Sequence, residues 1–253
     1  MEFSSVLDQP VSVLMPVCNE VDVIEGVLKE WDTEVFRHLP AGSELLLNDC
    51  SSDGTEKILT RLQEACPYLR VLFTKREGFF KASVRLYQEA RCPLIFFTDS
   101  DGQYVASEFW KIAGDISRFD IVHGAKLRRQ DPYYRLLASN MFNVITRLMF
   151  GTQSDDVNSA FRLIRKEALE DLIPKIRHLP TLLNAEMLIR AEMEGYKVKS
   201  LGVAHRARQV GKSRGLPLRG FLRECARTYA GLFRLRREYR HFDSKKMVNI
   251  KNY

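Results

Sequence analysis

Short apolar runs alternate with segments of helical spacing through the first half of the chain. The apolar runs are 11–15 (VSVLM), 45–47 (LLL), 71–73 (VLF) and 94–97 (LIFF), and helical spacing is found near 21–31, 55–66 and 79–90. This alternation is typical of a mainly parallel β-sheet flanked by helices. We therefore expect an α/β fold whose ligands bind at the carboxyl ends of the strands.

The second half of the chain has a different pattern. Residues 120–126 (DIVHGAK) predict a further strand, and longer helical stretches at 132–150 and 181–195 flank residues 160–166 (AFRLIRK). We expect this half to add some antiparallel pairing to the sheet. The chain shows no internal repeat, so we predict one globular domain over residues 1–215.

The last part of the chain, residues 216–253, predicts a basic amphipathic tail. Arg219, Arg223 and Arg227 recur every four residues, and Leu218, Leu222, Cys225 and Tyr229 follow another side of the same helix. Such a helix is suited to an anionic membrane surface. The alternative is that it packs on the domain with its charged face in water.

Composition restricts the class of protein. The 253 residues are 45% hydrophobic and 28% charged, as in a globular protein, and no apolar run approaches the length of a membrane span. The first residues (MEFSSVLDQP) lack the features of a signal peptide, and five scattered cysteines form no CxxC pair. We expect a cytoplasmic protein, peripheral at the membrane. The net charge of +7 indicates an anionic partner: phosphate, nucleic acid or an acidic membrane surface.

Two acids directly follow the apolar run that ends at Phe97. Asp99 and Asp101 stand one residue apart, with Gly102 and Gln103 behind them. At the end of a strand both carboxylates can reach one Mg²⁺ or Mn²⁺ ion, since these cations prefer oxygen ligands. The alternative is an ordinary Asp-Gly turn, which local preferences alone explain.

Polar residues also follow the first two strands. Asp49 and Asp53 lie in NDCSSDGT, where either can accept hydrogen bonds from a nucleobase or ribose, or cap the helix that begins near Thr55. Pro16 and Glu20 lie in PVCNE after the first strand. Because the carboxyl ends of parallel strands meet at one edge of a sheet, we expect these clusters to converge.

The motifs, taken in order from about Val11 to Arg214, resemble the family 2 glycosyltransferases with the GT-A fold. Within them the chain is similar to the polyprenyl-phosphate (dolichyl-phosphate mannosyltransferase-like) sugar transferases, whose DxDxQ signature appears as Asp99, Asp101 and Gln103. NDCSSDGT resembles their DDxSxDGT, with Asn48 in place of the first Asp and Asp49 at the nucleobase position. Phe79 and Phe80 replace small residues of the family.

The resemblance implies sugar transfer from a UDP- or GDP-sugar with inversion at the anomeric carbon. It implies that Asp99, Asp101 and Gln103 hold Mg²⁺ or Mn²⁺, and that Asp101, Arg208 and Glu186 are catalytic, Glu186 in the region where relatives with hydroxyl acceptors keep a base. The implied donor-binding residues are Pro16, Glu20, Asp49, Asp99, Asp101, Gln103, Arg208 and Ser213.

The resemblance also implies a polyprenyl (dolichyl or undecaprenyl) phosphate as acceptor. The family's acceptor-phosphate positions are occupied by Lys126, Arg129, Arg135 and Ser139. Arg135 and Ser139 are four residues apart and share a face of the predicted helix. An anionic lipid phosphate needs cations to position it more than it needs a strong general base.

Two other functions fit parts of the sequence. A transferase of the same fold with a saccharide or other hydroxyl acceptor is favoured by the lack of membrane helices, whereas the cationic acceptor set favours a lipid phosphate; a membrane-anchoring partner protein would reconcile the two. A basic nucleic-acid-binding protein is the alternative of another class. We expect no nucleic-acid partner, because acids clustered at the strand ends repel a polyanion.

Overall fold

The computed structural model describes residues 6–127, 133–207 and 218–250, with side chains of the last segment described for residues 220 and 223–239. These residues form a seven-stranded sheet in the order β3-β2-β1-β4-β6-β5-β7. The strands are β1 (Val11–Val17), β2 (Glu44–Asp49), β3 (Leu69–Phe73), β4 (Leu94–Phe97), β5 (Ile121–Leu127), β6 (Arg162–Arg165) and β7 (Val198–Ala204).

Only β6 runs against its neighbours. It pairs antiparallel with β4 and β5, whereas β1–β2, β1–β4, β2–β3 and β5–β7 are parallel pairs. The predicted mixed, mainly parallel sheet is therefore confirmed. The strand β7 and the short helix α6 were not predicted.

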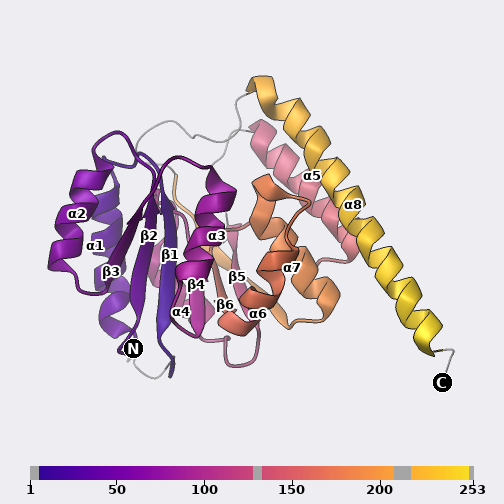
Figure 1. The fold of residues 1–253 in the computed structure, drawn as a ribbon, viewed down its shortest axis with the longest axis horizontal. Helices are drawn as coiled ribbons and strands as arrows, with labels where there is room; N and C mark the ends of the chain where they lie inside the picture. Colours follow the sequence, from indigo (N-terminus) through magenta and orange to yellow (C-terminus); the bar gives the residue numbers. More distant parts are fainter. Residues whose placement is uncertain (1–5, 128–132, 208–217, 251–253) are drawn as a thin grey trace.

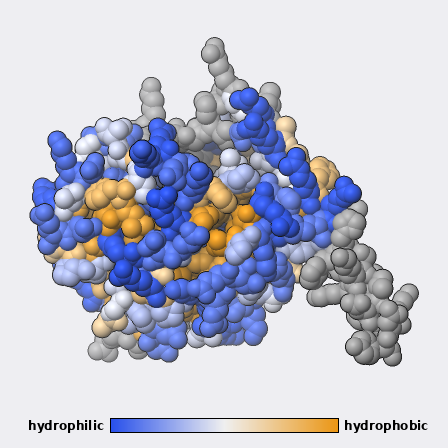
Figure 2. All heavy atoms as spheres, in the orientation of Figure 1, coloured by the Kyte–Doolittle hydropathy of each residue, from blue (hydrophilic) through white to orange (hydrophobic). Residues whose placement is uncertain are grey.

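Helices cover the sheet, as Figure 1 shows, and α5 and α8 lie side by side at the end of the molecule away from α1 and α2. Figure 2 shows hydrophilic residues over most of one face, with apolar residues gathered in hollows between them. The helices are α1 (Ile24–Glu34), α2 (Thr55–Ala65), α3 (Phe79–Glu89), α4 (Phe109–Ala113), α5 (Tyr133–Phe150), α6 (Lys166–Leu172), α7 (Leu183–Glu194) and α8 (Leu218–Ile250).

The central strands are buried on both faces. Every residue of β2 and β4 is buried, as is all of β1 except Pro16. Continuous apolar runs of this kind suit a parallel sheet that has helices on both sides. Trp31 of α1 packs its ring on Phe96 of β4, with centroids 5.5 Å apart. This dense core holds the strand ends, and the residues that follow them, in fixed positions.

Glu186 is a structural residue at the start of α7. Its side chain is fully buried. Its carboxylate accepts hydrogen bonds from Nε and Nη2 of Arg190, at 3.0 and 2.9 Å, and from the backbone amides of Arg177, His178 and Leu179. A buried carboxylate with this many donors fixes the preceding loop against the helix.

A second carboxylate, that of Glu238, ties α8 to the same cluster. It accepts hydrogen bonds from Arg190 at 3.1 Å and from Nε2 of His178 at 2.7 Å. Leu232, Leu235 and Tyr239 of α8 are buried in the common hydrophobic core. The middle of α8 thus packs on the domain, and none of the described helices is long and apolar enough to cross a membrane.

Replacing Glu238 by Gln is expected to lower the free energy of unfolding at pH 7 by about 1–3 kcal/mol, as for other hydrogen bonds to charged groups. Burial raises the pKa of Glu238, but the hydrogen bonds from Arg190 and His178 outweigh it and lower the pKa from 4.5 to about 2. The stabilisation is therefore complete above about pH 4.5 and is lost as the pH falls toward about 2. Urea unfolding should show the wild type and Glu238→Gln converging as the pH is lowered through this range.

Glu170→Gln is the matched control, because Glu170 is 67% exposed and lies 4.0 Å from Lys166. We expect it to change the free energy of unfolding by less than about 0.5 kcal/mol at any pH. A difference between wild type and Glu238→Gln that stays constant as the pH falls would contradict the role given to this carboxylate.

Candidate active site

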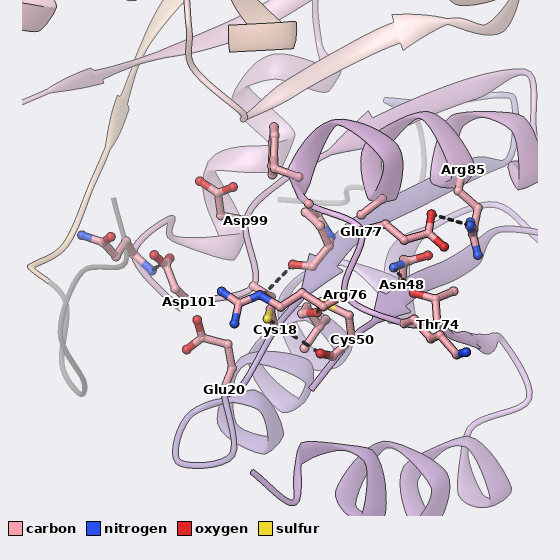
Figure 3. Close-up of a pocket in the computed structure, with 18 residues that line it drawn as sticks. Cys18, Glu20, Asn48, Cys50, Thr74, Arg76, Glu77, Arg85, Asp99 and Asp101 are labelled. Atoms are coloured by element: carbon pink, nitrogen blue, oxygen red, sulfur yellow. Dashed lines mark hydrogen bonds and ion pairs between the residues drawn. The ribbon is translucent and has the colours of Figure 1, made fainter. Parts of the chain in front are cut away.

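A cavity of about 530 Å³ opens where β1, β2, β3 and β4 end. The polar residues at its wall come from the ends of these strands, from the loops that follow them and from α3, and Figure 3 shows them gathered around the cavity. The lining residues are Pro16, Val17, Cys18, Glu20, Asn48, Cys50, Thr74, Lys75, Arg76, Glu77, Gly78, Phe79, Ala82, Arg85, Asp99, Ser100, Asp101 and Gln103. The predicted convergence of the strand-end clusters is therefore present in the structure.

The acidic side of the cavity consists of Glu20, Asp99 and Asp101. Figure 3 shows their carboxylates around the guanidinium group of Arg76. The turn after β4 is fixed by two hydrogen bonds: the backbone amide of Gln103 donates to Asp101 Oδ1 at 3.1 Å, and Ser100 Oγ donates to the carbonyl of Pro16 at 2.9 Å. The second bond joins the ends of β4 and β1.

These acids fit a cation that is shared with a ligand. The described residues contain no group of three or more His, Cys, Asp or Glu side chains able to hold a metal ion. Mg²⁺, however, is usually held by one or two carboxylates together with substrate phosphates and water. Asp99 and Asp101 at the wall of an open cavity fit that arrangement, in which a bound diphosphate and water would supply the remaining ligands.

The basic side of the cavity was missed in the sequence analysis. Lys75, Arg76 and Arg85 line it, and Arg85 forms an ion pair with Glu77 at 3.0 Å. Only Thr74 separates Lys75 and Arg76 from the end of β3, so the signal in the sequence was a basic pair close behind the third strand. Cations and paired acids in one cavity make a site suited to a diphosphate and its metal ion.

Asn48, and not Asp49, lies at the cavity wall. Neighbouring residues of a strand face opposite ways, and Asp49 turns to accept hydrogen bonds from Ser51 N and Oγ at 3.1 and 2.5 Å. Burial raises the pKa of Asp49. Asn48 Nδ2 donates to Thr74 Oγ1 at 3.0 Å, while its buried Oδ1 has no hydrogen-bond partner among the described residues. The structure thus brings Asn48 to the cavity wall, and the contact of Asp49 with a nucleobase stays a prediction.

Asp53 binds the first residue of helix α2, whose N-cap is Gly54. Its Oδ1 accepts hydrogen bonds from Thr55 N at 3.1 Å and Oγ1 at 2.6 Å, and its Oδ2 accepts one from Val21 N at 3.3 Å. Asp53 therefore fixes the loop that carries Glu20 to the start of α2, from the position before the N-cap.

The segment after β7 is tied to the acidic turn. Gln103 Nε2 donates to the carbonyl of Arg206 at 3.1 Å, and Arg206 N donates to the carbonyl of Gln103 at 2.7 Å. Arg206 also forms an ion pair with Glu30 at 2.8 Å. The predicted site residues Arg208 and Ser213, which follow, and Arg129 lie outside the described residues.

The predicted acceptor residues that the structure describes, Lys126, Arg135 and Ser139, lie outside the cavity lining. Lys126, near the end of β5, stacks over the ring of Tyr104 at 5.6 Å, next to the acidic turn. Arg135 and Ser139 lie four residues apart in the first half of α5, and both are half-buried. Burial raises the pKa of Tyr104 to about 12, and the nearby charges of Lys126, Asp99 and Asp156 also act on it.

The structure does not bring the predicted catalytic residue Glu186 to the cavity. Glu186 is fully buried behind its five hydrogen bonds and is not among the lining residues. Asp156 is a buried acid that the sequence analysis did not single out. It is 5% exposed, and its Oδ2 has no hydrogen-bond partner among the described residues. Its charge acts on Tyr104, the residue that follows Gln103.

The model of the family described as glycosyl transferase family 2 matches residues 12–173. This span covers the cavity and most of the sheet. The chain belongs to the family 2 glycosyltransferases.

Curated relatives are similar over part of their length. The chain is 27% identical over 166 residues to the undecaprenyl-phosphate 4-deoxy-4-formamido-L-arabinose transferase of Klebsiella pneumoniae (strain 342), covering 64% of this chain and 51% of the relative. It is 26% identical over 212 residues to the enzyme of that name from Serratia proteamaculans (strain 568), covering 81% and 62%. The chain thus spans about half or somewhat more of the curated relatives it matches.

Solved structures show the same fold. Glucosyl-3-phosphoglycerate synthase from Mycobacterium tuberculosis, in complex with phosphoglyceric acid, has a TM-score of 0.68 at 19% identity, over 91% of this chain and 81% of that one. A mannosyltransferase from Pyrobaculum calidifontis, in complex with GDP-Man and Mn²⁺, has a TM-score of 0.59 at 20% identity, over 83% and 59%. The expected GT-A fold is confirmed.

Replacing Arg76 by Gln is expected to weaken the binding of a nucleoside diphosphate about tenfold, because a charge-assisted contact to phosphate is lost. The loss should be smaller at high salt, since screening weakens the contact in the wild type. Titration calorimetry with UDP and GDP in the presence of Mn²⁺ measures it.

Arg61→Gln is the control for this variant. Arg61 is 62% exposed on α2, pairs with Glu25 and does not line the cavity. It should leave the affinity within about twofold of the wild type. Equal affinities of the two variants would exclude Arg76 from the binding site.

Proposed function

We propose that this protein transfers a sugar from a UDP- or GDP-sugar to a polyprenyl phosphate. The observation that carries the proposal is the cavity at the strand ends, whose wall combines the acids Asp99 and Asp101 with the bases Lys75 and Arg76. Both signs of charge are needed to hold a nucleoside diphosphate together with a divalent cation. The names of the curated relatives support the lipid phosphate acceptor, and the neighbours solved with Mn²⁺ support a divalent cation.

The donor half of the reaction requires stabilisation of the leaving nucleoside diphosphate. When bound, Mg²⁺ or Mn²⁺ supplies a Lewis acid that neutralises charge on the leaving phosphate. Asp101 and Asp99 would hold this cation, with Gln103 beside them. Arg76, and Arg208 from the segment that follows Arg206, would bind phosphate oxygens directly. Pro16, Glu20 and Asn48 would shape the nucleoside end of the cavity, and Ser213 stays a predicted donor contact.

The acceptor half requires positioning more than deprotonation. A lipid phosphate is anionic near neutral pH, so its oxygen can attack the anomeric carbon without a strong base. Attack from the side opposite the leaving group inverts that carbon. Lys126, Arg129, Arg135 and Ser139 would bind the acceptor phosphate. The buried position of Glu186 agrees with this chemistry, because no base is required at its place.

The site of action would be the cytoplasmic face of a membrane, where a lipid acceptor is found. Arg223 and Arg227 of α8 are exposed, and this basic face is suited to anionic lipid headgroups. Contact with the membrane would be peripheral, and a membrane-anchoring partner protein would strengthen it.

Purified protein supplied with Mg²⁺ or Mn²⁺, UDP- and GDP-sugars and a short polyprenyl phosphate is expected to form glycosylated lipid from one donor. Asp101→Asn should lower the rate by about 100-fold or more, because charge on the leaving group is then poorly neutralised. Asp155→Asn should leave the rate within about twofold, since Asp155 is 86% exposed and pairs with Arg147 away from the cavity. Thin-layer chromatography of the lipid product gives the rate.

The other outcomes of this assay are decisive. Metal-dependent nucleotide binding without lipid product would show that the acceptor is wrong and would favour a saccharide or other hydroxyl acceptor. If the protein bound no sugar nucleotide, the proposed enzymatic function would be excluded.

Arg135→Gln is expected to raise the KM for polyprenyl phosphate about tenfold and to leave donor affinity unchanged, because Arg135 would contact the acceptor alone. Arg147→Gln, on the same helix, provides the control: Arg147 pairs with Asp155 at 2.9 Å and is 53% exposed. Initial rates over a range of acceptor concentrations separate KM from kcat. A fall in donor affinity in Arg135→Gln would contradict the assignment.

A further inference from the structure

Helix α5 carries a row of exposed apolar side chains. Leu137, Met141, Val144 and Leu148 are 56%, 46%, 53% and 80% exposed, and Tyr133 at the start of the helix is 80% exposed. Their spacing of three and four residues places them on one face of the helix. Phe233 on the neighbouring α8 is 68% exposed. We call these six residues the apolar stripe.

The apolar stripe borders a groove between α5 and α8. The groove has a volume of about 450 Å³ and is lined by apolar residues and one tyrosine: Met141, Ile145, Leu148, Met149, Tyr229 and Phe233. Figure 1 shows the two helices side by side at the edge of the molecule, where nothing else in the described chain covers them on the outside. Contiguous exposed apolar residues of this kind mark interaction sites with membranes or proteins.

The opposite face of α5 packs on the domain. Phe142, Thr146 and Phe150 are buried there. Arg135 and Ser139 precede Phe142 and Thr146 at the same three- and four-residue spacing, so they lie on this inner side. Leu137 lies about 200° around the helix from Arg135, at 3.6 residues per turn. The predicted acceptor residues therefore lie on the inner face of α5, and the apolar stripe lies on its outer face.

The exposed face of α8 beside the stripe is basic. Arg223, Arg227, Arg234 and Arg237 are exposed along it, together with Phe233. Of these arginines, Arg227 has an ion pair with Glu224. Apolar side chains next to a row of arginines are the combination found in helices that lie in the interface of anionic membranes. A two-fold dimer through the same surface would instead bring the arginines of both copies together.

We propose that the apolar stripe on α5 and α8 inserts into the headgroup and acyl boundary of an anionic lipid bilayer. The inference rests on the proposed function, because a polyprenyl phosphate is presented at such a boundary. The inference adds to the electrostatic contact proposed for α8. The main apolar contact with the bilayer would be made by α5, the helix whose inner face carries Arg135 and Ser139. Docking would thus place the acceptor residues just above the lipid headgroups.

The test is sedimentation of the full chain with vesicles of phosphatidylcholine and phosphatidylglycerol. The double variant Leu137→Gln/Leu148→Gln, which leaves every charge in place, should lower the fraction bound at least about tenfold relative to the wild type, because two apolar side chains no longer leave water. Phe73→Gln is the matched control, since Phe73 is 45% exposed on β3; it should bind like the wild type. Unaltered thermal unfolding shows that both variants are folded.

Three outcomes would overturn the proposal: absence of vesicle binding by the wild type, equal binding by the double variant, or a wild-type dimer in solution that the double variant lacks. The last would assign the stripe to a second copy of the chain. Transfer to a long-chain acceptor in vesicles should fall in the double variant, while transfer to a short, water-soluble acceptor should not. If the wild type transfers sugar to neither acceptor, the proposed function fails, and vesicle binding still decides the role of the stripe.

Discussion

The parallel pairing of β1 with β2 and β4 is the constraint on which the site depends. Val17 lies beside Asp49 where β1 and β2 end, whereas Phe97, the last residue of β4, lies beside Leu14. The turn after β4 then follows the last part of β1, because Thr98 N and Ser100 Oγ donate to the carbonyls of Leu14 and Pro16. Because these strands are buried on both faces, the chain cannot shift along them without exposing apolar side chains or breaking ladder hydrogen bonds. The polar residues that follow each strand are therefore held close together. A loop alone would not hold Asp99, Asp101 and Asn48 at one cavity.

Close placement of like charges carries an electrostatic cost that the cavity offsets internally. Glu20, Asp99 and Asp101 repel one another, and the guanidinium of Arg76 lies among them (Figure 3). A divalent cation would neutralise the acids and release Arg76 toward phosphate oxygens. In the protein without ligand, the side chain of Arg76 thus stabilises the acids, and the same side chain would bind the phosphate when the ligand and its metal ion are present. This arrangement explains why paired acids and adjacent bases occur together at this edge of the sheet.

The sequence predicted those features that depend only on the pattern of neighbouring residues along the chain. The strands 11–15 and 94–97 and the position of Asp99 and Asp101 at a strand end could be predicted, because a strand end is visible as the point where an apolar run stops. For the second half of the chain, the sequence indicated some antiparallel pairing but not the strand that makes it. The sequence does not tell which of Asn48 and Asp49 reaches the cavity. The answer depends on which face of the sheet each side chain points to and on which elements cover that face. Lys75 and Arg76 looked like ordinary loop residues until β3 was placed beside β2.

Glu186 shows a different limit of prediction. Its motif position suggested a base near the active centre, but burial and the converging amides of the loop 177–179 are tertiary features that no spacing reveals. The same carboxylate orients Arg190, which in turn holds Glu238 of α8. An acid assigned to catalysis thus fixes the helix that runs beside α5. In this chain the polar cluster around Glu186 fixes the position of the outer helices. The proposed reaction would take place at the cavity where the strands end, so the Glu186 cluster has a structural role and the cavity a chemical one.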